Sequence, residues 1–380
     1  MQPKVKIKNV LRFHGRIFLF LLCAVFFSQH AYSSEKGKRI FSPYSLRANA
    51  HWGFVIPHHH EMWALTDGYF PSFDFTIFRQ TNGKRAWHYL YSYPVIGLSY
   101  RYSNFGGSKY LGKAHTLVPF IIFPIVKSEK IQLGFKAGLG IGYLTRKFHR
   151  LENYKNLAIG SHLNAAVSFE LLSRFKLSKR MFFNAGLSLM HLSNGTIKTP
   201  NYGLNIPAIF GGFTYKVNNV PVQYLKPENI PDNKGKINFR LMLWGAGKQV
   251  DQHWDGQFLV LVLTGDFSGF YNNRNRILIG FDMIYDESVK YVLESDSIEI
   301  NNNKEIINYG INIGHEWVLE KLSLYFAVGM YVHAIDKPER AIYDKIGIYY
   351  AITPRLVFGA TLKAHYAQAD YFSVGVGFNL

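Results

Sequence analysis

The residues of this chain best suited to chemistry are a histidine and a serine spaced two apart, His191 and Ser193, in the string L-M-H-L-S-N-G. Residues i and i+2 of a β-strand share one face, with Cα atoms roughly 6.6 Å apart. The imidazole can therefore reach the hydroxyl, and a serine beside a histidine is the simplest activated nucleophile. The alternative is a polar strand end entering a turn, because Asn194 and Gly195 follow at once.

The segment before this pair alternates with the period of a β-strand. Odd positions from 181 to 189 are apolar, whereas the even positions include Asn184, Gly186 and Ser188. His191 and Ser193 continue the odd-numbered face, which lipid would cover if the strand belonged to a membrane barrel. A serine there could attack an ester carbonyl, while the histidine takes the hydroxyl proton and returns it to the leaving alcohol.

The same alternation recurs along most of the chain, for example in I-Q-L-G-F-K-A-G-L-G-I-G-Y-L at 131–144. Aromatic residues make up 16% of the chain and glycine occurs 33 times. We predict strands near 47–56, 72–80, 94–103, 115–126, 131–144, 160–172, 180–193, 206–216, 237–247, 256–267, 276–285, 306–319, 322–333, 345–353, 356–365 and 371–380.

These features predict an all-β protein, an antiparallel transmembrane β-barrel of about 14–16 strands. Connections after strands 4, 6, 12 and 14 are short, and most of those after odd-numbered strands are longer and more polar. Outer-membrane barrels have short periplasmic turns and long external loops, which places the ends of odd strands outside. Segment 217–236 is long but falls on the periplasmic side. It could link two sub-barrels, so the alternative is an eight-stranded barrel unit plus a second β unit.

The N-terminus predicts export. A basic start, an apolar run from Ile17 to Phe27 and the small residues around Ser33 are typical of a signal peptide over residues 1–33. Residues 34–380 would then form the barrel. The single cysteine, Cys23, lies in the signal, so disulfides and thiol chemistry are excluded from the remainder.

The formal net charge is +18, and an exported basic protein favours an anionic surface as its neighbour. Phosphorylated lipid headgroups fit this expectation, and nucleic acid does not. The run His58-His59-His60-Glu61 is more typical of an exposed loop than of a metal site, because consecutive residues rarely chelate one ion. We expect no metal and no cofactor. The oligomeric state stays open.

The longer string H-L-S-N-G-T-I-K-T-P-N-Y-G-L-N resembles the active-site segment of the outer-membrane lipid A 3-O-deacylases, the PagL family of acyloxyacyl hydrolases. The resemblance is close over the predicted strands 180–193 and 206–216 and loose over the rest of 34–216, and residues 217–380 have no counterpart in the short eight-stranded members. It implies Ser193 as nucleophile and His191 as base. It also implies Asn201, with the backbone near Asn194 and Gly195, as the oxyanion hole, and lipid A as the substrate in the outer leaflet of the outer membrane.

One position departs from that family, whose members place a glutamate twelve residues after the serine, where this chain has Asn205. An amide can orient the histidine, or Glu170 could substitute as the acid. Outer membrane phospholipase A also resembles the segment and uses an asparagine at this spacing. That family, however, has an arginine and a serine associated with calcium where this chain has Thr196 and Asn201.

The sequence therefore predicts a serine esterase of the outer membrane that removes an ester-linked acyl chain from lipid A, with Ser193, His191 and Asn205 as its triad. A phospholipase A is the first alternative. The second is a barrel without catalysis, a channel or structural protein in which H-L-S-N is only a strand tip.

Overall fold

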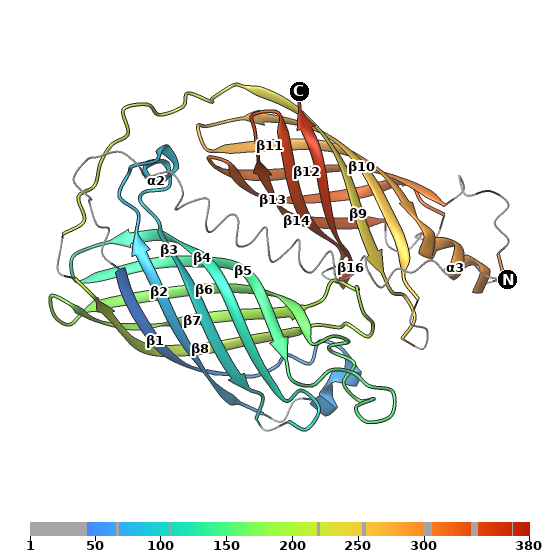
Figure 1. Cartoon of the computed structure of the whole chain (residues 1–380), viewed down its shortest axis with the longest axis horizontal. Coiled ribbons are helices and arrows are strands. Elements are labelled where there is room, and N and C mark those ends of the chain that lie inside the picture. The colour runs from blue at the N-terminus through green and yellow to red at the C-terminus, as the bar shows by residue number, and fades with distance from the viewer. Residues whose placement is uncertain are drawn as a thin grey trace. The chain divides into compact units, whose positions relative to one another are not determined.

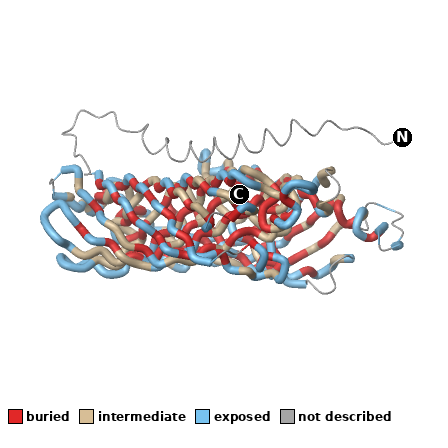
Figure 2. The backbone as a smooth tube through the Cα atoms, turned by 90° about the horizontal axis from the view of Figure 1, so that it is seen from below, coloured by how far each residue is buried: buried red, intermediate tan, exposed pale blue. Residues whose placement is uncertain are grey.

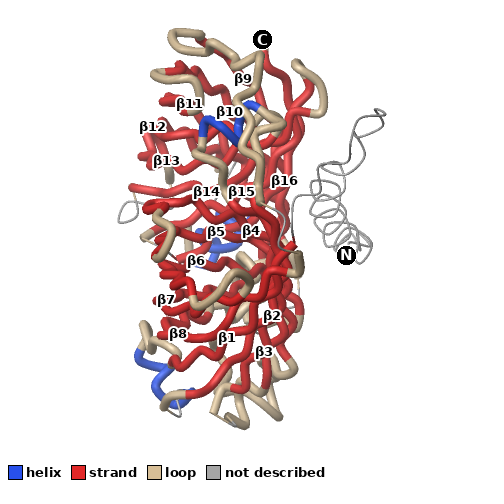
Figure 3. The backbone as a smooth tube through the Cα atoms, turned by 90° about the vertical axis from the view of Figure 1, so that its left-hand side faces the viewer, coloured by secondary structure: helices blue, strands red, loops and turns tan. Residues whose placement is uncertain are grey.

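A computed structural model of the chain describes residues 44–65, 68–106, 108–218, 221–252, 256–295, 297–298, 302, 306–335, 341–366 and 368–380. The expected signal peptide, residues 1–33, lies outside them. Most of the described residues lie in antiparallel strands, and the helices among them are short and occur in connections, as the red and blue segments of Figure 3 show.

Eight strands come from the N-terminal half of the chain: β1 (Tyr44–Gly53), β2 (Phe70–Gln80), β3 (Val95–Asn104), β4 (Lys113–Lys127), β5 (Ile131–Leu144), β6 (Leu163–Lys176), β7 (Met181–Ser193) and β8 (Leu204–Lys216). Eight more follow: β9 (Ile237–Lys248), β10 (Phe258–Phe270), β11 (Asn275–Asp286), β12 (Ile307–Leu319), β13 (Leu322–His333), β14 (Ile342–Ala351), β15 (Leu356–His365) and β16 (Gln368–Asn379). The all-β class and the predicted strands are confirmed.

The strands close as two barrels, so the expectation of a single large barrel is wrong and its alternative is confirmed. β1 pairs with β2 and β8, and β9 pairs with β10 and β16, each antiparallel. Figure 1 shows the first barrel in blue to green and the second in yellow to red. Segment 217–236 connects them. Two separate closures leave neither sheet with an unpaired edge strand.

Alternation of side chains places the polar residues of each strand inside the barrel. Along β1 the even-numbered residues from 44 to 52 are exposed and the odd-numbered ones are buried, and other strands repeat the pattern. Figure 2 shows buried and exposed positions alternating along the strands. The buried positions include many charged residues, as expected for a barrel whose outer face meets lipid.

The interior of the first barrel holds an ionic cluster. Glu170 accepts hydrogen bonds from Arg47 at 3.2 Å, Arg101 at 3.0 Å and Lys136 at 2.7 Å. An eight-stranded barrel is just wide enough for side chains to fill. Paired charges therefore occupy the middle of this barrel. The channel alternative requires instead that charged residues surround an open lumen.

In the described parts of the chain, three helices lie in connections: the 3-10 helix η1 (His60–Leu65) after β1, α2 (Ala86–Leu90) after β2 and α3 (Glu287–Ser295) after β11. Within the described part of the chain, no helix has the length and apolar character needed to cross a membrane.

Candidate active site

The His-Ser pair lies at the end of β7, on the hairpin that β7 forms with β8. Their register sets His191 directly opposite Asn205, and β6 places Ala165 opposite Ser193. The odd-numbered residues Leu187 and Leu189 of β7 are exposed on the outer face, as expected. His191 and Ser193 continue that face where the strand ends, so the site interrupts an apolar outer surface.

Asn205 orients His191. The histidine Nδ1 lies 2.7 Å from Asn205 Oδ1, and since an amide oxygen only accepts, Nδ1 carries the proton. A neutral imidazole protonated on Nδ1 has a lone pair on Nε2. Hydrogen bonding to Asn205 therefore fixes the tautomer that a general base requires.

Two donors converge on the hydroxyl of Ser193. The Gly195 backbone N–H donates to Ser193 Oγ at 3.2 Å, and Asn201 Nδ2 donates at 2.9 Å. Among the hydrogen bonds of the described residues, none joins Ser193 to His191. Catalytic hydrogen bonds are often loose without substrate, so this geometry is compatible with a nucleophile and its base.

Asn194 acts through both its backbone and its side chain to hold the loop. Its backbone N–H donates to Asn201 Oδ1 at 3.0 Å, which aims the other end of that amide at Ser193. The residue is 6% exposed, and its side chain donates to Ser161 Oγ and to the Lys198 carbonyl, both at 2.9 Å. The Asn194 N–H is thus already bonded, and the donors at the serine are Gly195 and Asn201.

Two glycines let the 194–203 loop fold this tightly. Gly195 (φ +62°) and Gly203 (φ +80°) adopt the left-handed backbone region that glycine occupies without steric cost. A Cβ on Gly203 would come within 3.0 Å of His191 Cε1. A side chain there would therefore displace the imidazole.

The loop after β1 contributes a residue that the sequence did not single out for this site. His58 Nε2 lies 2.9 Å from the Tyr202 carbonyl oxygen, and its Nδ1 lies 3.5 Å from Asn205 Nδ2. The neighbouring His59 stacks on the Tyr202 ring at 4.1 Å. His58 is thus a second contact of the amide that orients His191. No spacing rule connects a residue of the first loop to the fourth hairpin.

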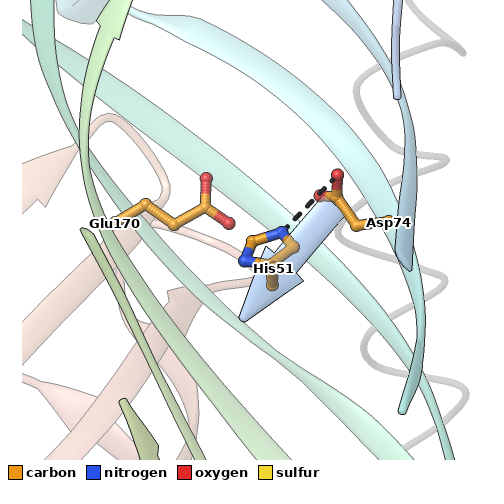
Figure 4. A group of neighbouring side chains, drawn as sticks. All are labelled: His51, Asp74 and Glu170. Atoms are coloured by element: carbon orange, nitrogen blue, oxygen red, sulfur yellow. Dashed lines mark ion pairs between the residues drawn. The ribbon is translucent and has the colours of Figure 1, made fainter. Parts of the chain in front are cut away.

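Glu170 is not the acid of this site, because it lies in a buried cluster inside the barrel. Glu170 bonds the interior cations instead of His191, whose partner is Asn205. Among the described residues, His51, Asp74 and Glu170 have metal-like spacing, and Figure 4 shows them facing one another inside the barrel. The adjacent Arg47, Arg101 and Lys136 already balance the two carboxylates. A cation would find no net negative charge there.

Comparisons with known proteins bear on this site. The family model described as "Lipid A 3-O-deacylase (PagL)" matches residues 36–214, and "Acyloxyacyl hydrolase, C-terminal domain" matches residues 237–380. No curated protein matches the chain. The crystal structure of the outer membrane enzyme PagL has 15% identity and TM-score 0.30, covering 46% of this chain and 99% of its own.

A mutant of the Rh. blastica porin has 8% identity and TM-score 0.18, covering 89% of this chain and 100% of its own. At these TM-scores the two solved structures add nothing to the assignment. It rests on the two family models, which together account for both barrels. The chain belongs to the acyloxyacyl hydrolase family of lipid A 3-O-deacylases, proteins of the outer membrane.

Proposed function

We propose that this chain is a serine hydrolase that removes the acyl chain esterified at position 3 of lipid A, with the first barrel carrying the reaction. The observation that supports this most is the local hydrogen-bond set. His191 is held by Asn205 at 2.7 Å, and Ser193 Oγ receives donors from Gly195 and Asn201. A nucleophile, an oriented base and two oxyanion donors are what acyl transfer requires.

In the proposed reaction, Ser193 Oγ attacks the ester carbonyl carbon as its proton passes to His191 Nε2. The negative charge on the former carbonyl oxygen is stabilised by the Gly195 N–H and by Asn201 Nδ2. The tetrahedral intermediate then collapses, and the leaving sugar hydroxyl takes the proton from His191. Water, deprotonated by the same histidine, hydrolyses the acyl-serine and releases the fatty acid.

The surroundings of the pair suit a lipid substrate. Leu187 and Ile209, which face each other in the β7–β8 register, are 58% and 61% exposed on the outer wall below the site. An acyl chain lying along this wall could keep its apolar environment while its ester reaches Ser193. The loop end of the odd strands would face outward, so that the reaction occurs in the outer leaflet.

The decisive experiment is mass spectrometry of lipid A from cells that express the wild type, Ser193→Ala or an empty vector. We expect loss of one ester-linked acyl chain with the wild type only. Ser178→Ala, in the turn before β7 at the other end of the strand, is the matched control and should behave as the wild type. Identical profiles for wild type and empty vector would refute the proposal.

A phospholipase A reaction is the second candidate, because the amide of Asn205 holds His191 as an asparagine does in that family. Against it, Asn201 bonds Ser193 directly and so has the role of an oxyanion donor, not that of the serine associated with calcium. Phospholipids from the same cells separate the candidates. Lysophospholipid formation with unchanged lipid A would favour the phospholipase.

A further inference from the structure

The first barrel contains a cavity at the end opposite Ser193. Asn184, near the start of β7, lines it, whereas Ser193 ends the same strand. The cavity has a volume of about 690 Å³. Ligand pockets commonly measure roughly 300–1,000 Å³, so the space is large enough for a small organic molecule.

The wall of this cavity carries cations without acidic partners. Arg174, Lys216 and Lys127 all line it, and none of the described residues in its lining is an aspartate or a glutamate. The guanidinium of Arg174 donates to the neutral amide oxygen of Gln132, with Nε at 3.1 Å. Among the ion pairs of the described residues, none includes these three cations. Elsewhere in the same barrel, Lys136 and Arg101 are paired with Glu170.

Arg47 provides a further hydrogen-bond donor in the cavity wall that faces the ionic cluster around Glu170. It is 3% exposed and lines the cavity, and its Nη2 is bonded to Glu170. Its buried Nε has no hydrogen-bond partner. A buried donor without a partner is costly, which favours binding of an acceptor near it.

The remaining wall is mostly apolar. Phe78, Val95, Ile122, Leu133 and Leu172 line the cavity from five of the strands. The positive groups and the apolar groups therefore line the same cavity. A ligand complementary to it has an anionic head and an apolar body.

The linker after β8 covers part of the mouth. Pro221, Val222 and Tyr224 line the cavity from this segment. The Leu225 N–H donates to the Asn82 carbonyl at 2.8 Å, and Tyr93 donates to the Leu225 carbonyl at 3.2 Å. Lys127 Nζ lies 5.3 Å from the Tyr93 ring centroid and 5.7 Å from that of Tyr224. A lysine and two aromatic rings, one of them from the linker, thus lie together at the mouth.

We propose that this cavity binds an organic oxyanion with an apolar tail, a fatty-acid carboxylate or an alkyl phosphate, with the head on Arg174 and Lys216 and the tail among the apolar side chains. Arginine suits this role because its planar donors match carboxylate and phosphate oxygens. The site is separate from Ser193 and does not depend on the proposed hydrolysis.

The test is calorimetric titration of the full-length protein, purified in a neutral detergent, with four probes: decanoate, decyl phosphate, inorganic phosphate and decanol. We expect one decanoate or decyl phosphate bound per chain. Inorganic phosphate and decanol should bind at least tenfold more weakly, because inorganic phosphate has no apolar tail and decanol has no anionic head. Stronger binding of decanoate would identify a fatty acid as the source, and stronger binding of decyl phosphate a lipid phosphate.

Arg174→Gln/Lys216→Gln should weaken decanoate binding at least tenfold. The matched control is Lys179→Gln/Arg180→Gln, which removes the same charge from a turn at the same end of the barrel and should change affinity less than twofold. Equal weakening by both pairs, binding of decanol as tight as that of decanoate, or no binding to the wild type would each overturn the proposal. If the first pair fails to fold, Lys216→Gln alone replaces it. Lipid A profiles should stay unchanged in both pairs.

Discussion

The two barrels have the same number of strands and the same closure, but they place their polar groups differently. In the first barrel, His191, Ser193 and Asn205 interrupt the outer wall at a strand end. Both barrels bury paired charges: Glu170 accepts from three cations in the first, and Glu316 is paired with Arg240 and Arg276 at 3.2 Å in the second. Paired interior charges fill a barrel and hold its shape. A site for a lipid requires polar groups on the face that lipid covers.

Histidines on strands sharpen this comparison. His115 Nδ1 lies 2.8 Å from the hydroxyl of Tyr100, and His315 Nε2 lies 2.8 Å from that of Tyr271. Each of these histidines is partnered by an aromatic hydroxyl, an arrangement expected near the aromatic girdles of a barrel. His191 instead has an amide on one side and a serine two residues away. The candidate site therefore differs from these other positions in the hydrogen-bond partner of its histidine.

The largest expected effect is that of His191→Ala. Removing a general base lowers turnover about 10²–10⁴-fold, and we expect a loss in this range for hydrolysis of lipid A by the purified enzyme. His315→Ala, a histidine of the second barrel with a tyrosine partner, should retain wild-type turnover. Equal losses of turnover for the two variants would show that His191 on the first barrel has no special role in hydrolysis.

A smaller effect is expected for Asn205→Ala. A neutral hydrogen bond contributes about 0.5–1.5 kcal/mol, so loss of the amide should lower turnover about 2- to 13-fold. Asn205→Glu, which restores the residue of the deacylases, should keep or raise activity, because a carboxylate stabilises the imidazolium better than an amide does. Initial rates over a pH series measure both. A loss for Asn205→Ala as large as that for His191→Ala would make Asn205 a full triad member.

The smallest effect on turnover is expected for Glu316→Ala in the second barrel. This change leaves Arg240 and Arg276 buried without their carboxylate, which typically costs about 3–5 kcal/mol of stability. The midpoint of heat-induced unfolding, followed by gel mobility, should fall, while turnover per folded enzyme stays the same. Glu129→Ala, which removes an exposed ion pair with Lys176, is the control and should leave the midpoint unchanged.

Strand positions could be predicted from the sequence, whereas barrel closure could not. Strand 131–144 was expected and β5 spans Ile131–Leu144, because period-2 alternation is a property of each strand alone. Closure depends on whether β1 meets β8 or β16, and both have the same alternation of outward and inward residues. The long segment 217–236 on the side of the short turns was the one sequence signal for two barrels.

The site was partly predictable for a similar reason. His191 and Ser193 share a strand face, and Asn205 follows from the β7–β8 hairpin, so local spacing brings all three together. The contact of His58 with Asn205 depends on how the first loop packs on the 194–203 loop, and no periodicity encodes that. The cations of the cavity could not be predicted either, because a sequence does not show which lysines and arginines form no ion pair with an acidic residue.

The linker between the barrels has a consequence for the gene. Every backbone hydrogen-bond ladder of the first barrel is complete when β8 ends at Lys216, since β8 itself returns to β1. A coding segment for a second barrel can therefore be joined or exchanged after that codon without opening the first sheet. The chain is in this sense a fusion of two barrels, each of which has a closed sheet of its own.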